Sequence, residues 1–348
     1  MTTRMRAEML ETPERLADQW AANQASMAMI AEHVRARGPA TPWWTVARGS
    51  SAHAATFFSA AAGLGANRVV GEITPSLFTV YDRCPPLADA IVLAISQSGA
   101  GEDINAVVEA SAASGALTLA LTNDPSSSVA GSAALTFDLA MGEETAVAAT
   151  KTFLGTLAAA ARLVTTMADD RSLDHALARL PDTLAQRRDD QPPLDAAALA
   201  GFDRAGFVLG RGVGLAVARE VALKFKEVCV TPAESFSAAE FIHGPLTLVS
   251  PGTPILMICL DDATRPGIMK TARRLVDLGA AVTLLGPNLP AAKDTDGLIT
   301  ISRPATDNVY TDAIAIAFDC YGALEARAVA LGYDPDQPPN VRKITSTY

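Results

Sequence analysis

The chain has few of the residues that mark secreted, metal-binding or aromatic-rich proteins. Its 348 residues include only four cysteines and four histidines, aromatic residues make up 5%, and no two cysteines form a C-x-x-C pair. Widely spaced cysteines indicate a reduced, cytoplasmic protein with no structural zinc site, and we expect all four to be small buried hydrophobic residues. We also expect no cofactor and no resident metal.

Basic residues are in the minority. Lys and Arg number 28 against 38 Asp and Glu, which gives a formal net charge of −10. This balance argues against nucleic acid or an anionic membrane as a partner, although a few local donors can still hold a small anion. The most apolar long stretch, residues 146–168, contains Lys151 and Arg162. We therefore expect a buried core helix there and no membrane span, and the N-terminus shows no signal peptide.

Hydrophobic residues make up 49% of the chain, enough for two globular domains at this length. Residues 1–35 show a helical pattern that ends at Gly38-Pro39. Apolar runs that are typical of buried strands then alternate with helical segments, which predicts an α/β fold of parallel sheets with helices on both faces. The predicted strands are residues 43–47, 90–95, 117–121, 207–210, 255–259 and 282–285.

The two halves of the chain share landmarks at a nearly constant spacing. Arg48-Gly49 and Arg211-Gly212 stand 163 residues apart, and Gly115 and Gly279 stand 164 apart. This spacing indicates duplication of a whole α/β domain. The predicted organisation is a helical arm (1–35), a first domain (36–170), a connecting helix and linker (171–195), a second domain (196–334) and a tail (335–348).

Two loops of the first half have the composition of an anion site. Ser96-Gln97-Ser98-Gly99 follows one predicted strand directly and precedes a helix that starts near Glu102, and Arg48-Gly49-Ser50-Ser51 follows another. Backbone N–H groups at a helix N-terminus, together with serine hydroxyls, can hold a phosphate. Neither loop has the lysine of a Walker loop. A serine that only caps its helix remains the alternative interpretation.

The second half differs at the corresponding positions. Adding the repeat spacing to Gln97 and Ser98 leads to Asp261 and Asp262, whose carboxylates would repel a phosphate. The glycines around Gly212 do not complete the dinucleotide motif G-x-G-x-x-G, because its last position is Leu215. The pattern predicts an anion-binding first domain and a supporting second domain.

Three ionisable residues of the second half could carry acid–base or nucleophilic chemistry. Glu227 lies in a helical pattern that starts near Val217, His243 lies in a turn, and Lys343 lies in the tail. These side chains can act as base, acid–base group and amine nucleophile. From spacing alone, a solvated helix residue, a turn residue and a tail charge remain open as alternatives.

At this point the motifs resemble a known family. The chain resembles the sugar isomerase (SIS) domain superfamily with two tandem SIS domains, and within it the isomerase half of glutamine–fructose-6-phosphate aminotransferase and its stand-alone deaminase relatives. The motifs that carry the resemblance span nearly the whole chain. They are AEMLETPERL (7–16), RGSS (48–51), SQSG (96–99), AVAATKTF (146–153), ALKFKE (222–227), ESFSAAEFIHGPL (234–246) and NVRKIT (340–345).

The resemblance implies two doubly wound, flavodoxin-like domains and a set of site residues. Glu227 would move a proton between C1 and C2, His243 would assist ring opening from the neighbouring subunit, and Lys343 would contact or covalently engage the carbonyl carbon. Substrate binding is implied for Ser50, Ser51, Ser96, Gln97, Ser98, for Val147 through its backbone, and for Lys224 near the sugar hydroxyls. The partners expected are a sugar phosphate and a second copy of the chain in a homodimer.

The sequence departs from the family pattern in two ways. Gly101 stands where the family has a threonine that donates to the phosphate. The glutaminase domain of the aminotransferase is not seen before Met1. We therefore expect an isomerising deaminase that converts glucosamine 6-phosphate into fructose 6-phosphate and ammonia. The alternatives are a fructosamine or fructose-amino-acid 6-phosphate deglycase, an aminotransferase-like isomerase, and a non-catalytic sugar-phosphate sensor.

Overall fold

The computed structural model describes residues 2–189, 199, 201–290 and 297–343, and these form two compact units. We call the first the β1–β5 unit; among the described residues it comprises Glu11–Glu144, Lys151–Pro181, Arg342 and Lys343. The second, the β6–β10 unit, comprises residues 2–10, Thr145–Thr150 and the described part of 182–341. Each unit is built around one parallel five-stranded sheet.

The β1–β5 unit has the strand order β2-β1-β3-β4-β5. Its strands are β1 (Trp43–Ala47), β2 (Val70–Glu72), β3 (Ile91–Ile95), β4 (Leu117–Thr122) and β5 (Leu135–Asp138). Its helices are α2 (Thr12–Arg37), α3 (Gly49–Ala66), α4 (Ser76–Thr79), α5 (Glu102–Ala113), α6 (Ser128–Ser132), α7 (Lys151–Ala168) and the first part of α8 (Arg171–Asp189).

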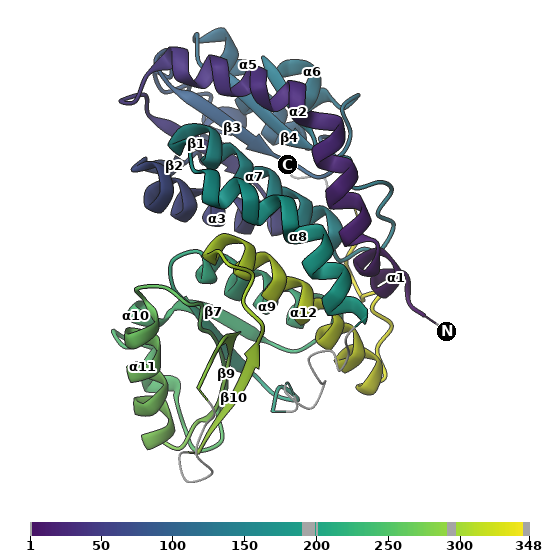
Figure 1. Cartoon of the computed structure of the whole chain (residues 1–348), viewed down its shortest axis with the longest axis vertical. Coiled ribbons are helices and arrows are strands. Elements are labelled where there is room, and N and C mark those ends of the chain that lie inside the picture. The colour runs from purple at the N-terminus through teal and green to yellow at the C-terminus, as the bar shows by residue number, and fades with distance from the viewer. Residues whose placement is uncertain (1, 190–198, 200, 291–296, 344–348) are drawn as a thin grey trace. The chain divides into compact units, whose positions relative to one another are not determined.

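The central strands of this sheet are buried on both faces, so they read as continuous apolar runs. All five residues of β3 are buried; Val92 and Ala94 pack in one core cluster with Val107 and Val108 of α5, and the residues between them face the other way. Figure 1 shows α5 and α6 on one face of the sheet and α3 and α7 on the other. The core therefore consists of two apolar layers with the sheet between them.

The β6–β10 unit has the same topology, with the order β10-β9-β8-β6-β7. Its strands are β6 (Gly206–Gly210), β7 (Ala233–Ser237), β8 (Pro254–Ile258), β9 (Ala281–Pro287) and β10 (Leu298–Arg303). Its helices are α1 (Arg4–Leu10), α9 (Gly214–Val228), α10 (Ala238–Phe241), the 3₁₀ helix η2 (Pro245–Leu248), α11 (Arg265–Asp277), α12 (Val309–Ala330) and the end of α8.

The repeat predicted from the sequence is confirmed strand by strand. In both units the first two strands are neighbours, and the third pairs with the first from the other side, which is the doubly wound arrangement. Gly49 and Gly212 have φ of 53° and 54°, and Gly115 and Gly279 have φ of 93° and 84°, so equivalent turns keep the same backbone conformation. The α/β prediction with two parallel sheets is correct.

Three local predictions need correction. The helix expected over 146–168 begins only at Lys151, because the carboxylate of Glu144 accepts from the backbone N–H of Thr152 and closes the helix N-terminus there. The edge strands β2, β5, β7 and β10 were not predicted. Cys84 is exposed, whereas the other three cysteines are buried and unpaired as expected.

Each end of the chain belongs to the unit formed mainly by the other half of the sequence: residues 2–10 belong to the β6–β10 unit, and Arg342 and Lys343 belong to the β1–β5 unit. The helix α1 packs on α12, and its first N–H groups, from Arg4 and Met5, donate to the carboxylate of Asp336 at 2.7 and 2.9 Å. Residues 335–341 of the expected tail therefore belong to the β6–β10 unit, whereas Lys343 belongs to the β1–β5 unit. Residues 344–348 of the tail and 190–195 of the expected linker lie outside the described residues.

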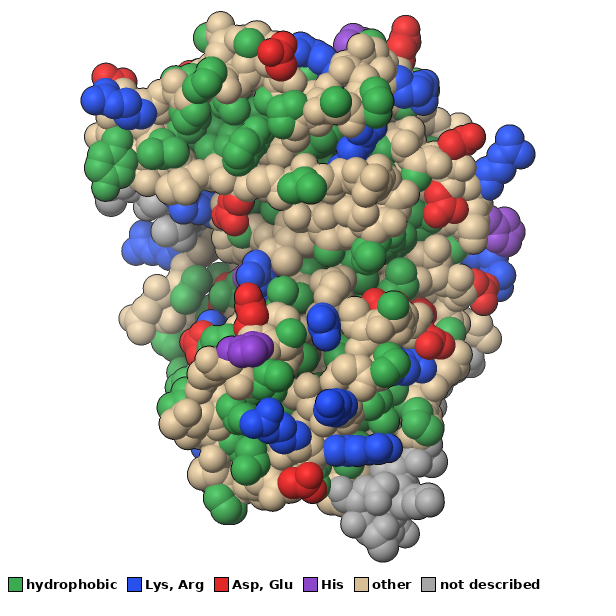
Figure 2. Space-filling model, turned by 90° about the vertical axis from the view of Figure 1, so that its left-hand side faces the viewer, with side chains coloured by type: hydrophobic (Ala, Val, Ile, Leu, Met, Phe, Trp, Pro, Cys, Tyr) green, Lys and Arg blue, Asp and Glu red, His purple; other side chains and the backbone are tan. Residues whose placement is uncertain are grey.

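The surface carries both signs of charge. On the side drawn in Figure 2, acidic and basic side chains are interspersed, and hydrophobic side chains gather on the upper part of that face. Among the helices that the structure describes, none is both long and apolar enough to cross a membrane. The described residues also contain no group of three or more His, Cys, Asp and Glu side chains arranged to hold a metal ion.

Candidate functional site

The two serine-containing loops lie side by side at the carboxyl edge of the first sheet. Strands β1 and β3 pair in parallel over their whole length, from Trp43 opposite Ile91 to Ala47 opposite Ile95. The chain turns to β2 on one side of this pair and to β4 on the other, so the two loops emerge at the topological switch point. Ligands of open α/β sheets bind in the crevice at this point.

The loop Ser96–Gly99 is held in place by its own backbone and by β4. Gln97 O accepts from the N–H of Asn123 at 3.0 Å, and the Ser96 hydroxyl oxygen accepts from the N–H of Gly99 at 3.2 Å. Gly99 has φ of 61°, and a side chain there would collide with the Ser127 hydroxyl. Glycine is therefore required at this turn, which leads the chain to the N-terminus of α5.

The other loop leaves open space beside its turn. Gly49 begins α3 with φ of 53°, and a side chain there would meet no described atom within 4 Å. Ser50 and Ser51 follow in the first turn of α3 and are half-buried. Arg48, just before them, donates through Nε and Nη2 to Asp103 of α5 at 2.9 and 2.8 Å, so one ion pair ties the two loops together.

The corresponding edge of the second sheet is occupied by its own side chains. Asp262 accepts from the N–H and the hydroxyl of Thr264 at 2.7 and 2.5 Å, and Asp261 pairs with Arg265 at 3.1 Å. Arg265 also donates to Leu260 O at 3.1 Å. The expected contrast between a serine-rich first edge and an acidic second edge is thus present in the geometry.

Helix α9 carries an ion cluster that ends at Glu227. The ammonium of Lys224 lies 3.2 Å from Glu220 Oε1 and 2.5 Å from Glu227 Oε2. The hydroxyl of Tyr321 on α12 donates to Glu220 Oε1 at 3.0 Å. Glu220, Lys224 and Tyr321 are fully buried, whereas the Glu227 side chain is 20% exposed. The cluster therefore presents one carboxylate at its accessible end.

Lys224 was expected near the sugar hydroxyls, and the structure places it within the ion cluster of α9. Its side chain is fully buried beneath Glu227, and its ammonium is occupied by two carboxylates. Burial alone would lower the pKa of Lys224, but the charges of Glu220 and Glu227 outweigh that effect and raise it. Lys224 thus stays protonated and holds the carboxylate of Glu227, because an unpaired buried charge is costly.

His243 lies at the surface of the β6–β10 unit. It follows α10 in a turn, where its N–H donates to Glu240 O at 2.9 Å, and its side chain is exposed. Leu248, at the end of the neighbouring helix η2, is also exposed. The structure therefore shows His243 as an exposed turn residue of this unit.

The segment that carries Val147 is fixed by the first helix. Glu8 of α1 is buried, and its Oε1 accepts from the N–H and the hydroxyl of Thr145 at 2.5 and 2.9 Å, while its Oε2 accepts from the N–H of Ala146 at 3.1 Å. Val147 follows directly in an irregular, half-buried stretch. The backbone at Val147 belongs to neither a helix nor a strand.

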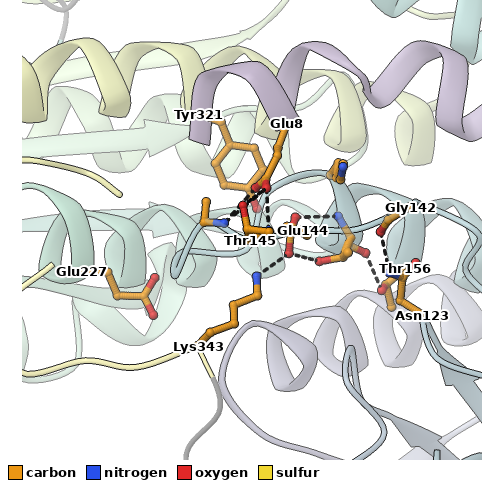
Figure 3. Close-up of polar contacts among 12 residues, drawn as sticks. Glu8, Asn123, Gly142, Glu144, Thr145, Thr156, Glu227, Tyr321 and Lys343 are labelled. Atoms are coloured by element: carbon orange, nitrogen blue, oxygen red, sulfur yellow. Dashed lines mark hydrogen bonds and ion pairs between the residues drawn. The ribbon is translucent and has the colours of Figure 1, made fainter. Parts of the chain in front are cut away.

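Lys343 reaches back to the residue that closes helix α7. Its ammonium donates to Glu144 Oε2 at 2.9 Å, and the same carboxylate accepts from the N–H and the hydroxyl of Thr152 at 3.1 and 2.6 Å. Figure 3 shows the Lys343 side chain extended toward Glu144. Glu144 is fully buried and Lys343 is 22% exposed, so the tail is anchored by a largely buried ion pair.

Several of these partners were missed from the sequence. Glu220 lies one helical turn before Lys224, and that spacing could have indicated an ion pair. Tyr321, Glu144 and Glu8 offer no local signal, because each acts on a residue brought to it by the fold. Glu8 does lie in the first of the motifs that carried the family resemblance.

The chain is similar in sequence to known proteins. A glutamine–fructose-6-phosphate aminotransferase [isomerizing] of Aeropyrum pernix is 35% identical over 272 residues, which cover 73% of this chain and 43% of that protein. The chain spans less than half the length of the relative it matches there.

Solved structures extend the likeness to the whole chain. A proposed phosphosugar isomerase from Silicibacter pomeroyi DSS-3 has a TM-score of 0.88 at 37% identity, covering 96% of this chain and all of that one. A glucosamine-6-phosphate deaminase of Thermotoga maritima has a TM-score of 0.75 at 18% identity, covering 99% of this chain and all of that one, which shows a shared fold. Residues 44–166 and 204–316 match the SIS domain, so the chain belongs to the SIS domain family.

Proposed function

We propose that this chain is a sugar-phosphate isomerase of the aldose–ketose type. The observation that carries the proposal is the cluster on α9, in which a buried lysine holds the partly exposed carboxylate of Glu227. A carboxylate of this kind can take a proton from one carbon and return it to the next. The serine-containing loops at the β1/β3 edge supply the donors that a phosphate needs.

The finer proposal is an isomerising deaminase of glucosamine 6-phosphate. Ser51 and the loop Ser96–Ser98 bind the phosphate, with Ser50 and the Val147 backbone beside the sugar, and His243 assists ring opening. Glu227 removes the proton from C2 of the open-chain aldehyde and delivers it to C1, while O1 gains a proton and the C2 nitrogen loses one, so that C2 becomes an imine and C1 a hydroxymethyl group. Water then adds to the imine carbon and ammonia leaves, giving fructose 6-phosphate.

Lys343 is assigned the role of a carbonyl-directed amine in this scheme. Its side-chain nitrogen donates to Glu144 Oε2 at 2.9 Å. A cationic donor beside C2 stabilises the oxygen or nitrogen that gains electrons as the proton leaves C2. Covalent engagement of C2 would require Lys343 to release its proton to Glu144 first.

A second candidate is the isomerase portion of an aminotransferase. It is favoured by the relative from Aeropyrum pernix, of which this chain spans 43%. Such a chain would make glucosamine 6-phosphate from fructose 6-phosphate only when ammonia is supplied. A deglycase for fructose-amino-acid 6-phosphates would share the carbonyl chemistry, and a sensor would bind the phosphate without turnover.

Release of ammonia and fructose 6-phosphate from glucosamine 6-phosphate tests the proposal directly. We expect equal amounts of both products, and a loss of about 10²-fold or more in Glu227→Gln. The control is Glu234→Gln, which changes an exposed carboxylate of the same unit. Folded wild-type protein that releases neither product refutes the deaminase. Faster turnover of a fructose-amino-acid 6-phosphate would favour the deglycase, and thermal stabilisation without turnover would favour the sensor.

The proposed homodimer has its own test, because His243 is proposed to serve the neighbouring subunit. Closed two-fold dimers are the commonest oligomers of soluble proteins. Glu227→Gln and His243→Ala subunits, each inactive alone, are mixed and allowed to exchange. Heterodimers that contain one intact site should recover up to about a quarter to a half of the activity per chain. Fully exchanged heterodimers without any recovery would show that each subunit uses its own His243.

A further inference from the structure

The acid–base residue Glu227 is the last member of a longer polar chain. Glu220, Lys224 and Glu227 stand on one face of α9, since they are separated by four and three residues. The other end of this series of polar contacts is Tyr321 on α12. Its side chain is buried, and its hydroxyl donates to Glu220 where α12 packs against α9. Nothing in the proposed reaction uses Tyr321 or Glu220 directly.

Two carboxylates compete for the ammonium of Lys224. Two carboxylates share one ammonium in a site that is buried except at Glu227, and Glu220 Oε1 accepts from both Lys224 and Tyr321. The ammonium lies 0.7 Å closer to Glu227 than to Glu220, since the two distances are 2.5 and 3.2 Å. A neutral hydroxyl donor on Glu220 satisfies part of that carboxylate and so lets the ammonium lean toward Glu227.

We propose that Tyr321 is a positioning residue that acts through Glu220 and Lys224 to fix the place and the charge of the Glu227 carboxylate. The inference rests on the proposed function only in naming Glu227 as the proton carrier. Tyr321 does not touch the substrate in this view. Its hydrogen bond to Glu220 determines how strongly the ammonium of Lys224 interacts with Glu227, and thereby how readily Glu227 is protonated.

Arg219 of α9 and Asp312 and Arg327 of α12 are also charged groups of the packed helices, and several of the remaining charged groups are paired away from Glu220. Glu234 of β7 lies 3.8 Å from Lys226 on the exposed side of the helix. On α12, Asp319 pairs with Arg187 and Arg303, and Glu325 pairs with Arg6. Strands β6 and β8, which also pack on α9, carry no ionisable side chain in their sequences. Within the described part of this unit, Tyr321 is the hydroxyl donor to Glu220 that bears on the division of the ammonium.

Two conservative variants should move the titration of Glu227 in opposite directions. Tyr321→Phe removes one donor from Glu220, so Glu220 attracts the ammonium of Lys224 more strongly and draws it away from Glu227, and protonation of Glu227 becomes easier. Glu220→Gln removes the competing carboxylate and leaves the ammonium to Glu227, so protonation becomes harder. One hydrogen bond corresponds to a shift of about half to one pH unit in each direction.

The test follows the carboxyl ¹³C signal of Glu227 by NMR as a function of pH, with Glu227→Gln used to assign it. We expect the midpoint to rise in Tyr321→Phe, to fall in Glu220→Gln, and to stay unchanged in Tyr310→Phe, which alters another buried tyrosine of α12. The acid limb of the kcat profile should shift in the same directions while KM for the sugar phosphate is kept. General damage to packing would not give opposite signs.

The outcomes separate this inference from the proposed function. An unchanged midpoint in folded Tyr321→Phe, or shifts of the same sign in both variants, overturns the positioning role. Wild-type protein without turnover of any hexosamine 6-phosphate overturns the proposed function instead, and the NMR midpoints still decide the role of Tyr321. If Tyr321→Phe does not fold, Glu220→Gln decides alone, because a midpoint that does not fall contradicts the competition for Lys224.

Discussion

Replacement of Glu144 by glutamine should destabilise the β1–β5 unit and release Lys343. The Glu144 carboxylate is fully buried and accepts from the N–H and the hydroxyl of Thr152 and from the ammonium of Lys343. A glutamine side chain would keep one acceptor oxygen for Thr152, but its amide N–H₂ would face the ammonium. A donor would then meet a donor at the position of the present ion pair.

The expected cost follows from these contacts. A hydrogen bond to a charged group contributes about 1.5–3 kcal/mol, and a carboxylate at a helix N-terminus adds about 0.3–1 kcal/mol. Lys343 is 22% exposed, so solvent screening reduces its share. We expect a loss of about 2–3 kcal/mol in the free energy of unfolding, which lowers the melting temperature by about 4–12 °C for a unit of this size.

Thermal unfolding followed by circular dichroism measures this cost, with Glu143→Gln as the matched control. Glu143 is the neighbouring carboxylate and is exposed, so its replacement should change the melting temperature by no more than about 2 °C. A double-mutant cycle with Lys343→Met isolates the ion pair, since the combined variant should lose less than the sum of the single losses. Equal melting temperatures for Glu144→Gln and Glu143→Gln would refute the anchoring role of Glu144.

Three further predictions concern the phosphate loops and the cysteines. Gly99→Ala should weaken fructose 6-phosphate binding in calorimetry by about tenfold or more, because the turn needs positive φ. The control Gly131→Ala should leave the affinity unchanged, because a side chain there meets no described atom within 4 Å. Equal affinities of the two variants would contradict the requirement for glycine at position 99. Gly101→Thr should tighten fructose 6-phosphate binding about tenfold by adding a hydroxyl donor. The backbone accepts a side chain here, because φ is −68° and the nearest atom to an added Cβ lies at 3.4 Å. Unchanged affinity would show that position 101 does not face the phosphate. A thiol reagent at pH 8 should modify only Cys84 in the native chain, because burial raises the pKa of Cys229 to about 12 and that of Cys259 to about 11; rapid reaction of a second thiol would contradict the burial.

The sequence allowed prediction of the central strands but not of the edge strands. Strands β1, β3, β4, β6, β8 and β9 were expected within one or two residues of their ends, because strands buried on both faces form continuous apolar runs. Strand β2 has only three residues, none of them buried, and β10 alternates between exposed and half-buried positions. Edge strands lack the apolar run because one side of their backbone and much of their surface face solvent.

The candidate site was predictable to the extent that its residues form local motifs. Ser96–Gly99 follows β3, and Glu227 lies in the last turn of α9, so spacing and the family resemblance were enough to select them. The partners that set their properties lie far away in the chain: Tyr321 is 101 residues from Glu220, and Lys343 is 199 from Glu144. A single sequence carries no signal for such pairs, because they are created by helix packing and by the return of the tail.

The two repeats differ in what fills the same turn. Gly49 and Gly212 share nearly the same φ, yet the space beside Gly49 is open among the described atoms, whereas Asp262 Oδ2 would lie 3.6 Å from a side chain at Gly212. That carboxylate lies at the second sheet's switch point, where the first sheet has serine hydroxyls and N–H groups. Since an anion would meet an anion there, our proposal that the phosphate binds only at the first repeat requires different side chains on a preserved backbone and nothing more. The overall charge of −10 has no part in this choice, because donors within a few ångströms outweigh distant charges that solvent screens.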